Sequence, residues 1–265
     1  MLQYGFMRYA LAALLIITPL FGLMGTMIVH KKMSFFSDAL GHSALTGVAL
    51  GVVLGVGNSN LSLIVFAILF ALLLNYIKQS NLMATDTIIS VFSSLSIAIG
   101  LAILSQGGNF SKYSNLLVGD ILSVTPKEIG YLLVIFFAAG LFWLLCFNKL
   151  HGISIDPVLA RTGGIKIRLI ENLFVVVVAV IVMLSIRWVG ILLINALLTL
   201  PAASSRNISV NMREYHLFSI IFSMFSGIMG LFLSFYINVA TGPMIVIISS
   251  LIFFATFLYS RKSMR

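Results

Sequence analysis

The residues best suited to chemistry lie in residues 37–47, where an aspartate and a histidine are four positions apart. At about 3.6 residues per turn, Asp38, His42 and Thr46 fall on one stripe of a helix. A carboxylate oxygen and an imidazole nitrogen at this spacing can bind one cation together, and this ligand mix suits Zn²⁺ and, nearly as well, Mn²⁺. The alternative is local, with Asp38 capping a helix and pairing with His42. Two protein ligands are fewer than a stable zinc site uses. This favours a waypoint, a site that binds the ion only briefly during its passage, over a storage site.

Two further polar residues lie at or inside apolar segments. Asn195 lies within an apolar span, where its amide must be hydrogen-bonded, so it either bridges helices or lines a pathway. Asp86 opens another span and fits ordinary helix capping, although it stays a pathway candidate. Because a charge at the centre of a membrane helix costs about 2.5–3.5 kcal/mol, such residues often mark functional sites.

The helix that must carry Asp38 and His42 has small residues on its next stripe, at positions 39, 43, 47, 51 and 55. Such a stripe allows a neighbouring backbone to approach closely. A lipid-facing helix needs neither a polar stripe nor a small-residue stripe. We therefore expect this helix to be buried among others.

The composition indicates an all-α, polytopic helical membrane protein. Of 265 residues, 60% are hydrophobic and 9% are charged, whereas soluble domains carry about 25% charged residues. The apolar segments approach the roughly 20 residues that cross a bilayer as a helix. We expect nine spans, with eight possible because two of them meet near residues 187–188. The expected spans are 9–29, 39–57, 60–77, 85–105, 128–147, 170–187, 188–206, 215–236 and 240–260.

The formal net charge of +9 comes from basic residues that punctuate the loops, so nucleic acid is not an expected partner. The longest polar interruption, residues 148–168, holds four basic residues and is expected to be cytoplasmic. Counting spans from there places the N-terminus outside and the C-terminus inside. No removable signal peptide is expected.

A short helix is predicted inside that interruption. Asp156 fits the N-cap position, Pro157 the first helical position, and the Gly163–Gly164 pair a stop. About two turns are too short and too polar to span a bilayer. The helix is either an ordinary capped loop helix or a docking helix for a cytoplasmic partner.

Four stretches, in order along the chain, resemble the membrane-spanning permease of the ABC-type zinc/manganese/iron uptake systems. They cover essentially the whole chain, and their combination is highly specific although none would suffice alone. Small departures, such as Ser37 and Gly41 in the first stretch, make the subtype unsafe to assign. The stretches are residues 32–42 (KMSFFSDALGH), 119–126 (GDILSVTP), 156–164 with Asp156, Pro157, Ala160 and Gly164, and 189–203 (VGILLINALLTLPAA).

The resemblance implies a single permease domain over residues 1–265, with an ATPase-coupling loop at about 149–169, that works as a homodimer in the cytoplasmic membrane of a prokaryote. It implies three kinds of partner: a cytoplasmic ABC ATPase, an extracytoplasmic solute-binding protein and membrane lipid. It supports the interpretation of Asp38 and His42 as metal ligands. Zn²⁺ is the favoured transported ion, and Mn²⁺ or Fe²⁺ is the alternative. No permanently bound cofactor is expected. The chain would then be a transport subunit and not an enzyme. Other classes are a secondary transporter without an ATPase and an intramembrane metalloenzyme.

Overall fold

The computed structural model describes residues 3–55, 59–79, 84–106 and 119–263. Within these ranges the chain is helical, without strands, and nine helices are long and apolar enough to cross a membrane. The prediction of nine spans is confirmed for this part of the chain. The elements are α1 (Gly5–His30), α2 (Ser34–Val53), α3 (Ser59–Lys78), α4 (Thr85–Gln106), the 3₁₀ turn η1 (Ile121–Ser123), α7 (Pro126–Ile155), the short α8 (Pro157–Thr162), α9 (Ile167–Val189), α10 (Ile191–Ile208), α11 (Met212–Ile237) and α12 (Thr241–Ser263).

The two spans that sequence separated least securely, α9 and α10, are divided by one residue. Gly190 has φ 80°, a left-handed value that costs a residue with a Cβ atom far more than glycine. Gly119, with φ 69°, lies against the Val189–Gly190 backbone so closely that a Cβ atom there would overlap it. A pair of glycines therefore makes the break. In contrast, α7 continues to Ile155, eight residues beyond its expected end, and Leu150 and Ile153 in this extension are buried.

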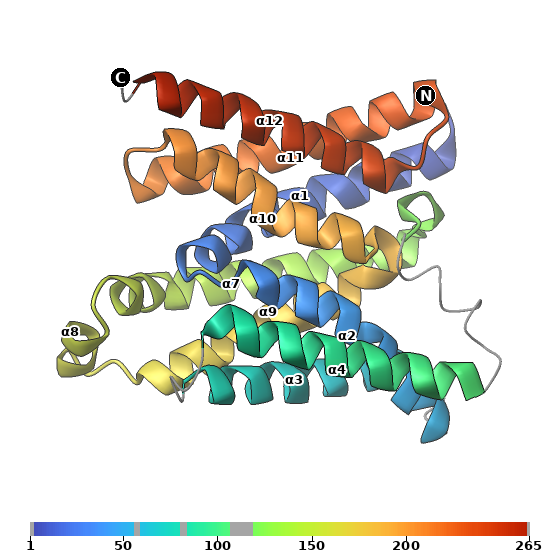
Figure 1. Ribbon diagram of the computed structural model, residues 1–265. Helices are drawn as coiled ribbons and strands as arrows, with labels where there is room; N and C mark the ends of the chain where they lie inside the picture. Colours follow the sequence, from blue (N-terminus) through green and yellow to red (C-terminus); the bar gives the residue numbers. More distant parts are fainter. Residues whose placement is uncertain (1–2, 56–58, 80–83, 107–118, 264–265) are drawn as a thin grey trace. The chain divides into compact units, whose positions relative to one another are not determined.

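The chain forms two compact units (Figure 1). Unit 1 comprises the described residues within Met1–Ser34, Asn115–Phe136 and Ser185–Arg265. Unit 2 comprises those within Phe35–Ser114 and Phe137–Leu184. In unit 1, α1, α10, α11 and α12 pack side by side. In unit 2 lie α2, α3, α4, α8 and most of α7 and α9.

The contact between α1 and α11 in unit 1 is a ladder of side-chain hydroxyls that donate to backbone carbonyls of α1. Inter-helix hydrogen bonds of this kind in membranes contribute on average about 0.6 kcal/mol each. The bonds are Tyr215 OH to the Thr26 carbonyl at 3.2 Å, Ser219 Oγ to the Gly22 carbonyl at 2.6 Å, and Ser223 Oγ to the Thr18 carbonyl at 2.7 Å. Donors and acceptors each advance by one helical turn, so the two helices are matched along three turns.

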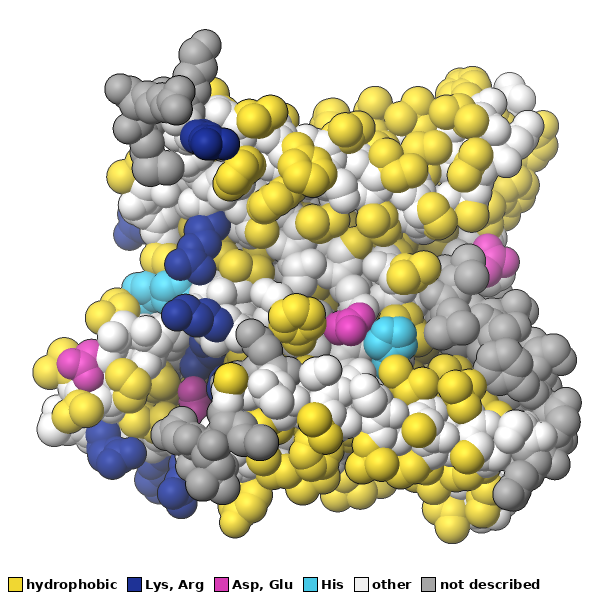
Figure 2. All heavy atoms as spheres, in the orientation of Figure 1, with side chains coloured by type: hydrophobic (Ala, Val, Ile, Leu, Met, Phe, Trp, Pro, Cys, Tyr) yellow, Lys and Arg dark blue, Asp and Glu magenta, His cyan; other side chains and the backbone are white. Residues whose placement is uncertain are grey.

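In unit 2, two glycines of the small-residue stripe of α2, Gly47 and Gly51, pack closely against α3. A Cβ atom on Gly47 would lie 3.2–3.3 Å from the Phe66 ring, and one on Gly51 would lie 2.6 Å from the Ser62 hydroxyl. Ser62 Oγ donates to the Gly47 carbonyl at 2.7 Å. Most of α2 is buried, whereas hydrophobic side chains spread over the outer face of α3 and α4 (Figure 2). The α2 helix is thus mostly buried, and the exposed apolar side chains of α3 and α4 suit contact with lipid.

Candidate functional site

The Asp38–His42 pair lies inside a helix and not at its start. Because α2 begins at Ser34, Asp38 is more than one turn into the helix, so the capping part of the local alternative is wrong, whereas the pairing of Asp38 with His42 is present. The Asp38 Oδ1 and His42 Nε2 atoms are 3.5 Å apart, and the two side chains keep 45% and 34% of their surface exposed. Sequence placed the two groups together correctly, and the structure adds that both remain accessible.

That separation suits two ligands of one ion better than a strong direct hydrogen bond, which is nearer 2.9 Å. Two atoms that are each about 2.0–2.2 Å from a tetrahedral metal ion lie roughly 3.4 Å from one another. The described residues contain no group of three or more His, Cys, Asp or Glu side chains that could hold a metal. The pair therefore offers two ligands, with further positions open to water or to other oxygen atoms.

Asp38 and His42 open into a hollow of about 610 Å³ between α2 and α4. The α4 side of this hollow carries hydroxyl groups, which were not among the site residues predicted from the sequence. Thr87, Ser90 and Ser94 are spaced i, i+3 and i+7, so they fall on one helix face. The 3.6-residue spacing of these hydroxyls was visible in the sequence. What it could not show is that this face meets α2.

Thr46, which its place on the stripe of Asp38 and His42 made a candidate for the pathway or for helix packing, is a packing residue. It is 3% exposed, its hydroxyl donates to the Ser96 backbone carbonyl of α4, and it receives the Ser96 hydroxyl at 3.1 Å. A Cβ atom on Gly100 would lie 2.8 Å from the Thr46 nitrogen, so the two helices touch at this level. Thr46 shares the stripe of Asp38 and His42, but it lies where α2 and α4 are in contact and not in the hollow.

Asn195 lies in unit 1, half-buried within α10, and its backbone carbonyl accepts a bond from Thr199 Oγ1 at 2.7 Å. The helix continues through Pro201. The backbone of Asp86 belongs to α4, but its side chain lies outside the described residues. The structure thus gathers Asp38 and His42 with α4 hydroxyls, and it places Thr46 in a helix contact.

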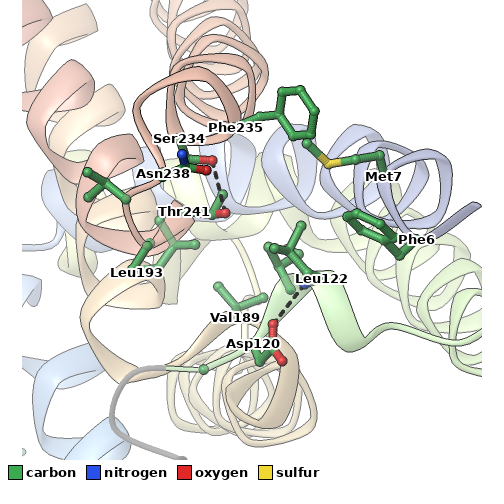
Figure 3. A pocket seen from close by; sticks show the side chains of 15 residues that line it. Phe6, Met7, Asp120, Leu122, Val189, Leu193, Ser234, Phe235, Asn238 and Thr241 are labelled. Atoms are coloured by element: carbon green, nitrogen blue, oxygen red, sulfur yellow. Dashed lines mark hydrogen bonds between the residues drawn. The ribbon is translucent and has the colours of Figure 1, made fainter. Parts of the chain in front are cut away.

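A second hollow, of about 430 Å³, lies in unit 1 among α1, η1 and the α11–α12 turn (Figure 3). Asp120 is the acidic residue among those lining it, and its Oδ1 accepts from the Leu122 amide at 3.1 Å as the cap of η1. Across the hollow, the Ser234 and Thr241 hydroxyls are 3.1 Å apart. One carboxylate that already caps a turn, within mainly apolar walls, does not make a metal site.

The short helix predicted inside the polar interruption is present as α8. Asp156 accepts from the Val158 and Leu159 amides at 2.8 and 3.1 Å, Pro157 is the first helical residue, and Gly163 ends the helix. Ala160 is buried, and Gly164 has φ 79°. These residues shape the helix. The side chains it presents are Val158 and Leu159, 73% and 71% exposed, which sequence analysis had not selected.

A family model, described as the ABC 3 transport family, matches residues 3–260. The chain belongs to this family. It is accordingly a multi-pass membrane permease, a transport component and not an enzyme.

The chain is also similar to curated proteins and to a solved structure over most of its length. The chain is 30% identical to the manganese import system permease protein ScaB of Streptococcus parasanguinis, over 98% of this chain and 92% of that protein. It is 30% identical to the high-affinity zinc uptake system membrane protein ZnuB of Haemophilus influenzae, over 87% and 88%. Among solved structures, PsaBC from Streptococcus pneumoniae in complex with a Fab matches with a TM-score of 0.83 and 28% identity, over 96% and 91%.

Proposed function

We propose that this chain is the permease subunit of an ATP-driven importer for a divalent transition-metal ion, and that Asp38 and His42 bind the ion during passage. The observation that carries the proposal is the accessible carboxylate–imidazole pair, 3.5 Å apart, at the edge of a hydroxyl-lined hollow. Relatives named for manganese import and zinc uptake support the substrate class. The ion is cargo, and no permanently bound cofactor is required.

Zinc is the favoured cargo because an imidazole nitrogen together with a carboxylate oxygen is a ligand mix that suits Zn²⁺. Manganese is the alternative, and a specific observation favours it: the hydroxyl oxygens of Thr87, Ser90 and Ser94 line the same hollow, and Mn²⁺ prefers oxygen ligands. Fe²⁺ belongs to the same class. Relatives at 30% identity include one named for manganese import and one named for zinc uptake, so they do not separate these ions.

We further propose that both units act as one permease domain and that two copies form a homodimer with the ion pathway at their interface. The partners are a cytoplasmic ATPase at the 149–169 loop and an extracytoplasmic protein that delivers the metal. The proposed setting is the cytoplasmic membrane of a prokaryote, with the N-terminus outside and the C-terminus inside. In this orientation Asp38 lies near the basic Lys31–Lys32 pair, on the inner half of the pathway.

In the proposed mechanism, ATP hydrolysis by the partner rocks the protomers so that the pathway opens alternately to each side. Asp38 and His42 replace part of the hydration shell of the ion while it is held. Because two protein ligands leave other positions to water and hydroxyls, the ion is bound weakly enough to leave. This balance suits transport better than storage.

The proposal is tested by uptake of radiolabelled Zn²⁺ and Mn²⁺ into vesicles that contain the permease and its ATPase. We expect uptake to require ATP, with Zn²⁺ competing better than Mn²⁺. Uptake that continues without ATP or the ATPase would indicate a secondary transporter. Processing of a lipid or peptide by the permease alone would indicate a metalloenzyme.

A second prediction concerns ATPase docking on α8. Replacing the exposed Val158 and Leu159 with aspartate is expected to weaken co-purification of the ATPase by at least about tenfold, because two apolar contacts are replaced by charges. The matched control is Val210→Asp in unit 1, where valine is 92% exposed. Equal ATPase recovery with the α8 variant would contradict the docking role.

A further inference from the structure

A basic hollow lies in unit 2 at the start of α9, within the 149–169 loop, and it shares no lining residue with the hollow of Asp38 and His42. It measures about 610 Å³, and three cationic side chains line it: Arg161, Lys166 and Arg168. All three residues are exposed, and no acidic residue is among those that line the hollow. Figure 2 shows Lys and Arg side chains gathered near α8 and the start of α9. Three like charges around one hollow repel one another, so an anionic ligand there would lower their electrostatic energy.

The local chain geometry brings these charges together. Arg161 lies in the last turn of α8, and Gly163 ends that helix. Gly164, with φ 79°, reverses the chain, and the Ile165 amide bonds back to the Ala160 carbonyl at 3.1 Å. The turn thus returns the chain past the end of α8 just before Lys166 and Arg168. The hollow is therefore formed by a hydrogen-bonded turn between α8 and α9.

The hollow also lies at the end of a membrane span. The candidate span in α9 runs from Ile167 to Ile186, so Lys166 and Arg168 flank its first residue, at the level where lipid headgroups lie. Leu169 lines the hollow and is 50% exposed, and Leu173, one turn further along α9, is 42% exposed. The basic hollow therefore continues into an apolar strip along the same helix.

We propose that this hollow binds the phosphate-bearing headgroup of an anionic phospholipid, with an acyl chain along Leu169 and Leu173. The Arg161 and Arg168 guanidinium groups match phosphate with paired donors, and Lys166 adds a point charge. The apolar strip favours a lipid over an acidic peptide or a free phosphate, because only a lipid has an acyl chain that can cover the exposed leucines within the bilayer. Basic pockets at the ends of membrane helices bind acidic headgroups in this way.

The test is native mass spectrometry of the full chain with added phosphatidylglycerol, phosphatidylcholine or inorganic phosphate. We expect phosphatidylglycerol to remain bound and phosphatidylcholine to dissociate. Each of Arg161→Gln, Lys166→Gln and Arg168→Gln should weaken phosphatidylglycerol binding about fivefold, and all three together about 100-fold. Arg168→Lys keeps the charge but loses the paired donors, so it should weaken phosphatidylglycerol binding less than Arg168→Gln does. Thermal unfolding checks that the variants, all at exposed positions, remain folded.

The matched control is Lys149→Gln, which removes a basic charge at an exposed position of unit 2 that does not line the hollow. This variant should bind phosphatidylglycerol as the wild type does, and an equal loss would overturn the proposal as a general charge effect. Displacement of the lipid by millimolar inorganic phosphate would overturn it in favour of a free-phosphate site. Unchanged lipid binding by the triple variant, with lost ATPase binding, would assign the hollow to a protein partner instead.

Discussion

Replacing His42 with alanine is expected to lower metal uptake by the reconstituted transporter at least about 100-fold. Loss of a group that only supports a metal ligand costs about 10–100-fold, and His42 is proposed as a ligand itself. Asp38→Asn should have a similar effect, because it keeps the shape of the side chain but removes the charge that attracts the cation. The measurement is initial uptake of ⁶⁵Zn²⁺ and ⁵⁴Mn²⁺ by vesicles with a saturating amount of the ATPase.

The matched control is His151→Ala in the same unit, where the histidine stacks on Phe147 with ring centroids 5.8 Å apart and does not line the hollow. This variant should transport at close to the wild-type rate. A double variant, Ser90→Ala with Ser94→Ala, should lower Mn²⁺ uptake more than Zn²⁺ uptake if the α4 hydroxyls serve as oxygen ligands. Wild-type uptake by both His42→Ala and Asp38→Asn would contradict the proposal that these two residues bind the ion during its passage.

Gly25→Ala is expected to destabilise the protein by about 3 kcal/mol, at the upper end of the usual cost of overpacking. Gly25 is buried on α1, and a Cβ atom there would overlap the backbone carbonyl of Leu198 on α10. A flexible side chain could turn away, but a backbone carbonyl inside α10 moves only if that helix moves. The free energy of unfolding in detergent, from equilibrium titration with a denaturing surfactant, measures the change.

Gly130→Ala is the control for that substitution. Gly130 lies on α7 within unit 1, is exposed, and has no atom within 4 Å of the added Cβ atom. Alanine favours helix over glycine by up to about 1 kcal/mol, so Gly130→Ala should leave stability unchanged or raise it. Equal stability of the two variants would show that α1 and α10 are not packed as closely as described.

Much of this architecture follows from local sequence. The apolar segments predicted the nine spans of the described residues, because length and hydropathy are local properties. Asp156, Pro157 and Gly163 predicted the short α8, because caps and stops act within a few residues. The start of α2 was placed at residue 39, five residues too late, because its first turns carry serines and an aspartate. A helix enclosed by other helices does not need an apolar beginning.

Only the α2 side of the candidate metal site could be predicted from the sequence. Asp38 and His42 belong to a single helix, so their spacing was sufficient to bring them together. The hydroxyls of Ser90 and Ser94 reach the same hollow only because α4 packs beside α2, which the order of residues does not specify. The same reason explains Thr46, whose partner Ser96 lies 50 positions away.

The hydroxyl ladder between α1 and α11 limits how unit 1 can change shape. In each of its three bonds, the donor and acceptor numbers have the same sum, 215 with 26, 219 with 22, and 223 with 18. Sliding one helix by a full turn, about 5.4 Å, would leave one donor and one acceptor unmatched at opposite ends. A smaller slide would break all three bonds. All three bonds therefore form together in only one register of the two helices. We expect α1 and α11 to move as one rigid body in any transport motion.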